Sequence, residues 1–384
     1  MSLSLTEVEF IHRHREEIAA LSARVGLSKA TALSDAEYAR TALGEYGRAA
    51  LEVIQARRAG AGKFPDTWLA DHDAAQQATP APVAAERARR LARHAGVVHD
   101  VTCSIGTEGH AYHRAGLDYL GSDVDAARAR MAAHNLPGAL ILRADALAPS
   151  SSADVIVADP ARRAGGRRIS DPARLLPPLP ALVAAYPGRN LAVKCAPGID
   201  YSEWEGLVSV SSVAGAVKEA CLYSPGLAEG VRREAVMVGP RGIDRLTDEG
   251  VVGRDTSEVG ADAPGRYIID PDGAVVRAGL VRHYAAREGL WMLDERIAYL
   301  TGDRLPRGRS GFQFREMVPL KKARAALKKH DAGAVEILVR GVDVDPDALR
   351  KQWKLKGANP MAVVCTRIGR QGVALICGPR TTEA

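Results

Sequence analysis

The sequence has few aromatic residues and lacks the patterns that mark disulfide, zinc and membrane proteins. Phe, Trp and Tyr make up 5% of its 384 residues, so Ala, Val and Leu must do most of the core packing. The five cysteines are odd in number and contain no Cys-x-x-Cys pair, which favours buried thiols over a zinc site. No stretch approaches 18 uncharged apolar residues, and the first residues lack a basic segment followed by an apolar run. We therefore expect a cytoplasmic protein with neither a metal nor a membrane partner.

Two common phosphate-binding motifs are also missing. The sequence contains neither Gly-x-Gly-x-x-Gly nor a Walker loop. A pyrophosphate cradle needs several close backbone N–H groups, which a turn with a single glycine at its tightest point, Gly106, does not supply. NAD and FAD are therefore poor candidates for a cofactor.

Residues 97–163 carry the pattern of an open parallel α/β sheet. Four short apolar runs alternate with helix-like stretches, and each run ends on an acid: Asp100, Asp123, Asp145 and Asp159. Ligands of such sheets bind outside the carboxyl ends of the strands, so we expect the four carboxylates to converge on one crevice. Asp123 follows the glycine-bearing turn by roughly 20 residues, the spacing that suits a ribose diol. The alternative role for Asp123 is the N-cap of the helix that follows it.

This series of motifs resembles that of class I S-adenosylmethionine (SAM) methyltransferases. Residues 100–108 are similar to the first motif, Asp123 to the second, Asp145 to the third and residues 159–162 to the fourth. From about residue 60 to the C-terminus, the chain resembles bacterial methyltransferases of the trimethylguanosine-synthase group that carry a C-terminal THUMP-like domain. The resemblance implies an α/β fold with a Rossmann-like methyltransferase core, an N-terminal helical region and small C-terminal α+β domains, one ferredoxin-like and one THUMP-like.

The resemblance also implies roles for individual residues. Asp123 would accept from the ribose hydroxyls of SAM and Asp145 from its adenine amine, and the full cofactor set would be Asp100, Thr102, Cys103, Gly106, Asp123 and Asp145. The catalytic set would be Asp159, Pro160 and Arg162, with Asp159 and backbone carbonyls holding an acceptor amine such as guanine N2. Relatives place a second proline and an aromatic ring where this chain has Ala161 and Arg162. A guanidinium group can stack on a base or bind phosphate, whereas the alternative for Asp159-Pro160 is an ordinary strand-ending turn.

We expect four parts: a helical region over residues 1–82, the methyltransferase domain over 83–233, a ferredoxin-like domain over 234–311 and a THUMP-like domain over 312–384. Within them the pattern predicts helices over residues 6–24, 34–58, 83–93 and 275–288, and an exposed linker over 239–265. The arginines of the 83–93 helix could contact phosphate, but a solvated face is the preferred interpretation: Arg87, Arg89, Arg90 and Arg93. Lys194 could face the site or an edge, and Glu219 is a weaker candidate acid.

The positive charge is concentrated near the C-terminus. Residues 315–384 contain 14 lysines and arginines against 7 acids, whereas the whole chain carries a formal net charge of +6. Such a face attracts a phosphate backbone, and THUMP domains bind RNA. The predicted RNA-binding residues lie in the glycine-rich loop after Asp159 and in the C-terminal segment: Arg163, Arg167, Arg168, Lys321, Lys322, Lys328 and Lys329. Solvated surface charge is the alternative for both groups.

The function these patterns favour is SAM-dependent methylation of a structured RNA such as tRNA or rRNA. Two alternatives stay open at this point. A small-molecule methyltransferase would share the cofactor crevice, and a non-catalytic RNA-binding protein would keep the fold after its fourth motif has changed to Asp-Pro-Ala-Arg.

Overall fold

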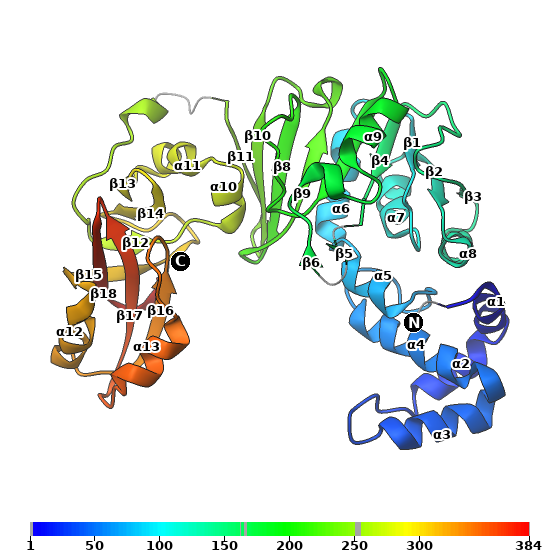
Figure 1. Cartoon of the computed structure of the whole chain (residues 1–384), viewed down its shortest axis with the longest axis horizontal. Helices are drawn as coiled ribbons and strands as arrows, with labels where there is room; N and C mark the ends of the chain where they lie inside the picture. The colour runs from blue at the N-terminus through cyan, green and yellow to red at the C-terminus, as the bar shows by residue number, and fades with distance from the viewer. Residues whose placement is uncertain (1–2, 162, 165–166, 250–254, 384) are drawn as a thin grey trace. The chain divides into compact units, whose positions relative to one another are not determined.

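The computed structural model describes residues 3–161, 163–164, 167–249 and 255–383 (Figure 1). Arg162 lies outside these residues, and so do the side chains of Arg163, Arg167 and Arg168. The chain forms two compact units, one of residues 1–232 with 238–243 and one of residues 233–237 with 244–384.

The first unit begins with a helical region whose helices are α1 (Leu5–Arg13), α2 (Arg15–Ser22), α3 (Ala32–Leu43), α4 (Gly47–Ala59), α5 (His72–Gln77) and α6 (Ala81–Leu91). Ser4 and Glu7 form a capping box that starts α1. The two long helices predicted over residues 6–24 and 34–58 are each broken. His14 leaves helical geometry between α1 and α2, and Gly44, at φ +58°, ends α3. Val8, Ile11, Ile18 and Val53 are buried in a core that these helices share.

A nine-stranded sheet follows, in the order β11-β10-β8-β9-β7-β4-β1-β2-β3. Its strands are β1 (Val97–Asp100), β2 (Asp118–Asp123), β3 (Leu140–Arg143), β4 (Val155–Ala158), β7 (Asn190–Cys195), β8 (Leu207–Val213), β9 (Ala216–Tyr223), β10 (Arg233–Gly239) and β11 (Gly242–Thr247). Five strands that are neighbours in the sheet run parallel: β7, β4, β1, β2 and β3. Strand β9 runs antiparallel to both β7 and β8. The four strands predicted within residues 97–163 are therefore confirmed as β1, β2, β3 and β4. The linker predicted over residues 239–265 is wrong in part, because β11 forms within it.

Helices lie between the parallel strands in the sequence and return the chain so that each strand can run in the same direction. Helix α7 (Thr107–Arg114) connects β1 to β2, α8 (Ala126–Asn135) connects β2 to β3, and α9 (Leu179–Ala185) precedes β7. After β3 the chain returns to the other side of β1 and forms β4 there. The strand order therefore reverses between β1 and β4, the position at which open parallel sheets bind their ligands.

The second unit contains a seven-stranded sheet, in the order β13-β14-β12-β15-β18-β17-β16. Its elements are β12 (Tyr267–Ile269), α10 (Gly273–Arg277), α11 (Val281–Glu288), β13 (Trp291–Asp294), β14 (Ile297–Gly302), β15 (Ser310–Pro319), α12 (Ala323–Lys329), β16 (Ala332–Val339), α13 (Pro346–Trp353), β17 (Asn359–Ile368) and β18 (Gln371–Thr382). The single helix predicted over 275–288 is wrong, because Gly279, at φ +75°, separates α10 from α11.

One sheet and one core join the two small C-terminal domains predicted from the sequence. Strand β12 pairs with β15 through Ile268 and Phe312, across the expected boundary near residue 311. Both of these side chains are fully buried, together with Val364 and Leu375 from β17 and β18. Residues 267–302 and 310–382, which form this sheet, therefore depend on each other for burial of their apolar faces.

All five cysteines are buried thiols without a disulfide, as predicted. Within the described ranges, no His, Cys, Asp and Glu side chains cluster in a metal-binding arrangement. In the same ranges no helix combines the length and apolar character needed to span a bilayer.

Candidate functional site

The carboxyl ends of β1 and β4 lie next to each other and are joined through Thr102. Asp100 pairs in register with Val157, so Asp159 follows two residues beyond it on the neighbouring strand. The Thr102 amide donates to Asp100 Oδ1 at 3.2 Å, and the Asp159 amide donates to Thr102 Oγ1 at 2.6 Å. Thr102, predicted to contact the cofactor, thus also fixes the two acids relative to each other.

The turn after β1 uses backbone geometry that few residues adopt. Ser104 has φ +51° and Gly106 has φ +86° at the start of α7. A Cβ atom at Gly106 would lie 2.8 Å from Leu136 Cδ1, so that side chain would have to move, and the positive φ would strain any residue that carries a Cβ. Cys103 is buried in this turn, and burial raises the pKa of its thiol well above the usual range. The thiol is therefore neutral and does not act as a nucleophile.

Asp123, at the end of β2, accepts one backbone hydrogen bond on each carboxylate oxygen. Ser104 N donates to Oδ2 at 3.0 Å and Asp125 N donates to Oδ1 at 2.9 Å. Each oxygen of an ionised carboxylate has a second acceptor site, so the group can still receive two hydroxyl donors. The N-cap of α8 is Asp125, which accepts from Ala127 N and Arg128 N at 2.8 and 3.1 Å. The alternative role of Asp123 as a helix cap is therefore wrong.

Asp145 lies beyond the end of β3, close to the backbone of Asp123. The Ala144 amide donates to the Asp123 carbonyl at 3.2 Å, and the Asp145 carboxylate accepts from Leu147 N at 2.9 Å. Its side chain is exposed, unlike those of the other three acids. Asp145 can therefore accept from a ligand at the rim of the crevice.

A buried chain of alternating charges runs behind Asp159. Lys194 Nζ lies 2.8 Å from Asp159 Oδ2 and 3.1 Å from Glu108 Oε1. Glu108 in turn accepts from Arg87 at 2.5 Å, and Arg87 also pairs with Glu219. These four charged residues are 2 to 4% exposed: Arg87, Glu108, Lys194 and Glu219. Lys194, for which the sequence left two orientations open, therefore faces the site.

The charge chain shifts the titration of the acids around it in opposite directions. Burial would raise the pKa of Glu108, but Arg87 and Lys194 hold it well below the usual range. Asp100 is 3% exposed; its burial, together with the negative charge of Glu108, raises the pKa of that carboxyl to about 7. Asp100 is therefore poised between its neutral and ionised forms at neutral pH, whereas Glu108 stays ionised.

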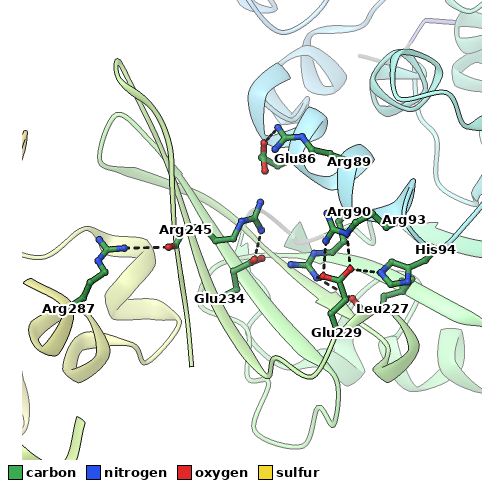
Figure 2. A network of polar contacts seen from close by, with 10 residues as sticks. All are labelled: Glu86, Arg89, Arg90, Arg93, His94, Leu227, Glu229, Glu234, Arg245 and Arg287. Carbon is green, nitrogen blue, oxygen red and sulfur yellow. Dashed lines mark hydrogen bonds and ion pairs between the residues drawn. The ribbon is translucent and has the colours of Figure 1, made fainter. Parts of the chain in front are cut away.

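Helix α6 supplies Arg87, and the solvated face predicted for this helix is wrong for two of its four arginines. Arg87 and Arg90 are 2% and 5% exposed. Figure 2 shows Arg90, Arg93 and His94 gathered around Glu229, to which Arg93 Nε and His94 Nε2 each lie at 2.8 Å. Arg93 holds the pKa of Glu229 at about 2. Arg87 and Arg90 therefore hold the helix to neighbouring elements by ion pairs, whereas Arg89 and Arg93 stay exposed.

A further contact brings the helical region over the turn after β1. The amide of Asn135, at the end of α8, donates to the carbonyls of Leu69 and Ile105 at 2.8 and 2.9 Å. The Asn135 Oδ1 atom accepts from the Leu69 amide at 2.8 Å. Residues 68–70 are buried by these contacts, which attach the segment between α4 and α5 to the candidate cofactor crevice.

A cavity of about 390 Å³ opens beside Asp159. The strand ends contribute Asp159, Ala161, Ala196 and Pro197, and β9 contributes Lys218 and Glu219. The remaining wall comes from the helical region: Lys63, Gln76, Gln77, Ala78, Thr79 and Pro80. Pro160, the second predicted catalytic residue, is buried next to Asp159.

The sequence did not reveal Arg87, Glu108 or the cavity wall as parts of the site. Glu108 is the last residue of the first motif, but nothing local indicates that it is buried. Arg87 and Glu219 lie 132 positions apart, so their pairing leaves no signal in sequence spacing. The predicted loop after Asp159 forms a two-stranded ribbon, β5 (Arg163–Ala164) and β6 (Arg167–Arg168).

The remaining predicted residues lie in the second unit, on exposed positions. Lys321 and Lys322 belong to a short 3-10 helix, Leu320–Lys322, and Lys328 and Lys329 end α12. All four side chains are exposed, whereas Ala323 and Leu327 between them are fully buried.

Comparisons with known proteins agree with this geometry. Residues 310–379 match the family described as THUMP domain-like, which confirms the predicted C-terminal domain type. An uncharacterized S-adenosylmethionine-dependent methyltransferase of Mycobacterium tuberculosis (strain ATCC 25618 / H37Rv) is 46% identical over 353 residues, covering 86% of this chain and 96% of the relative. A protein with the same description from the CDC 1551 / Oshkosh strain matches equally. The crystal structure of a candidate methyltransferase from Porphyromonas gingivalis W83 shares the fold, with a TM-score of 0.69 over 99% of this chain and 100% of that chain at 18% identity.

Proposed function

Since this chain belongs to the S-adenosylmethionine-dependent methyltransferases, we propose that it transfers the methyl group of SAM to a structured RNA such as tRNA or rRNA. The observation that carries this proposal is the exposed lysine face of the THUMP-like domain. Guanine N2 is the acceptor atom that the sequence resemblance suggests.

The strand-end acids fit the nucleoside part of SAM. Asp123 presents a carboxylate whose two oxygens each retain an acceptor site, which matches the two hydroxyl donors of a ribose. Asp145 is exposed at the neighbouring strand end and can accept from the adenine amine. Asp100 and Gly106 would border the methionine part, with Thr102 and Cys103 forming the turn between them. When bound, SAM supplies a sulfonium methyl group that a nucleophile can accept with little acid–base assistance.

The residues around Asp159 would align the acceptor. Lys194 holds the carboxylate of Asp159 at 2.8 Å from its Oδ2 atom, and Thr102 Oγ1 accepts from the backbone amide of Asp159 at 2.6 Å. An acceptor amine held by Asp159 would therefore meet a rigid partner, and holding two reactants at near-attack distance is itself a large part of catalysis. We include Pro160 and Arg162 in this motif because they follow Asp159 directly.

The basic face of the THUMP-like domain supports RNA as the substrate. Lys321, Lys322 and Lys328 are exposed and make no ion pair within the described residues, and Lys329 lies 3.9 Å from Glu316. A second basic group lies in and after α13, all exposed: Arg350, Lys351, Lys354 and Lys356. Trp353, between these residues, is 5% exposed and so cannot stack on a base. Such a surface favours recognition of RNA by backbone and shape.

Charge reversal in the full-length chain tests this proposal. Deleting the C-terminal residues would break the sheet that β12 and β15 share, so we choose four substitutions: Lys321→Glu, Lys322→Glu, Lys328→Glu and Lys329→Glu. We expect the affinity for folded tRNA, measured by fluorescence anisotropy, to fall at least about tenfold. The slope of log K against log salt should also become shallower by about 0.9 for each phosphate that the protein no longer neutralises.

The matched control reverses four exposed cations of the helical region: Arg15, Arg24, Lys29 and Arg40. This variant has the same net charge and should retain most of the affinity. Equal losses in both variants, or none in the lysine variant, would contradict a role for the THUMP-like face. Binding without methyl transfer would favour a non-catalytic RNA-binding protein, and no RNA binding would favour a small-molecule methyltransferase.

A further inference from the structure

The cavity beside Asp159 differs from the cofactor crevice in its lining, which combines carboxylates, amides and two lysines. We propose that it holds the acceptor nucleotide, with the nucleotide's phosphate on Lys218 and Lys63. This inference rests on the proposed function, because it assigns the substrate class of the same site. A volume of about 390 Å³ lies within the range of small-molecule pockets, about 300–1,000 Å³, and suits a single nucleotide taken out of its stack.

The two carboxylates that line the cavity already have buried cationic partners. Asp159 pairs with Lys194 at 2.8 Å, and Glu219 pairs with Arg87 and accepts from Thr79 Oγ1 at 3.3 Å. Both partners lie behind the cavity wall, 4% exposed or less. Asp159 and Glu219 therefore do not neutralise Lys63 and Lys218, the two lysines that line the same cavity.

The two lysines lack such a counter-charge. Lys63 Nζ donates to the carbonyls of Ala75 and Gln76, at 2.9 and 2.8 Å, which hold the ammonium in place without cancelling its charge. Lys218 is exposed, and across the described residues neither lysine lies within ion-pair distance of a carboxylate. Burial lowers the pKa of Lys63, and the positive charge of Lys218 lowers it further, so the two ammonium groups influence each other. An anion placed between them would relieve this repulsion.

The helical region supplies amides that can contact the base. Gln77 is exposed at the end of α5 and lines the cavity, whereas Gln76 lies 2.7 Å from His72 through its amide nitrogen. A side-chain amide both donates and accepts, so it can pair with the edge of a flipped base. The N-terminal helices would thus take part in recognising the substrate as well as in covering the turn after β1.

The test compares nucleosides with their phosphates on the full-length protein saturated with S-adenosylhomocysteine. The four ribonucleosides and their 5′- and 3′-monophosphates are titrated by calorimetry into wild type, Lys218→Ala and the surface control Lys29→Ala. For at least one base, we expect a monophosphate to bind about tenfold more tightly than its nucleoside to wild type and Lys29→Ala. Lys218→Ala should bind the two forms equally. In methylation of RNA, the same variant should raise KM about tenfold while kcat changes little.

Several results would overturn the inference. These are equal binding of nucleoside and monophosphate by wild type, no mononucleotide binding, or a phosphate preference that survives in Lys218→Ala. Failure of the proposed function gives a different result: the phosphate preference would be present and dependent on Lys218, but RNA would gain no methyl group. If RNA is methylated and Lys218→Ala has the wild-type KM, the cavity assignment is wrong while the proposed function stands.

Discussion

At the scale of single residues, neighbouring carboxylates differ in chemistry because their surroundings differ. Asp125 accepts hydrogen bonds from the backbone amides in the first turn of α8. Asp123 accepts only one backbone hydrogen bond on each carboxylate oxygen. Asp100 is buried, and its carboxylate accepts from Thr102 N. Their positions could be predicted because apolar strand runs end visibly in the sequence. The residue types do not show which of Asp123 and Asp125 caps the helix, because both are aspartates and only the backbone geometry places the start of α8 after Asp125.

Replacing Asp123 tests the ribose contact. Because two charge-assisted hydrogen bonds would be removed, Asp123→Ala should weaken binding of S-adenosylhomocysteine about 100-fold or more in calorimetric titration. Asp125→Ala is the matched control: it removes the α8 cap and about 1 kcal/mol of stability, but should leave the affinity close to wild type. Equal affinity of wild type and Asp123→Ala would remove Asp123 from the cofactor site.

The pKa of Asp100 predicts a pH-dependent stability. The folded protein holds this proton up to about pH 7, whereas the unfolded chain releases it near its usual pKa of about 4. The stability contributed by the protonated group is therefore fully present below about pH 4 and is lost as the pH rises through 7. Asp100→Asn, which stays neutral, should be no more stable than wild type near pH 4. Above pH 7, the free energy of unfolding of this variant should exceed that of wild type by up to roughly 4 kcal/mol.

Urea denaturation of the cofactor-free protein at a series of pH values measures this difference. Glu108 has the opposite sign, because its lowered pKa contributes stability that is lost as the pH falls. That contribution is common to both proteins and cancels in the comparison. A difference between wild type and Asp100→Asn that stays constant with pH would show that Asp100 titrates normally.

At the scale of elements, helix α6 shows where charge patterns mislead. Four arginines within seven positions are typical of a solvated face, yet two of them are buried because their partners are supplied by α7, β9 and the segment after β9. Burial of a charge depends on a distant partner, which local periodicity does not report. The breaks in the helices predicted over residues 34–58 and 275–288 are a different case, because Gly44 and Gly279 stand in the sequence and adopt positive φ.

Two arginines of this segment should differ sharply in their effect on stability. Arg87→Met removes the buried cation paired with Glu219 and leaves Glu108 with Lys194 alone, so it should lower the free energy of unfolding by about 3–5 kcal/mol. Arg93 is 47% exposed, so Arg93→Ala should lower it by about 1 kcal/mol or less. Chemical denaturation measures both. Similar losses for the two variants would mean that the buried charge chain does not stabilise the fold.

At the scale of the whole molecule, the sequence predicted the order of the parts better than their packing. The alternation of strands and helices in residues 97–195 follows from apolar periodicity and short turns, and all of those strands are found. The seven-stranded sheet of the second unit depends on pairing between β12 and β15, more than 40 positions apart, which no local pattern reveals. The cavity beside Asp159 is likewise assembled from residues 63–80, 159–161, 196–197 and 218–219.

Methyl transfer to RNA is the decisive measurement for the proposed function. Purified wild-type protein, Asp159→Ala and Asp123→Ala are each incubated with SAM tritiated in its methyl group and with tRNA and rRNA, and label is measured in the nuclease-sensitive fraction. We expect label in RNA with wild type and its loss with both variants, while Asp159→Ala still binds S-adenosylhomocysteine. Wild-type protein that binds S-adenosylhomocysteine but leaves every RNA unlabelled, or full labelling by Asp159→Ala, would contradict this expectation.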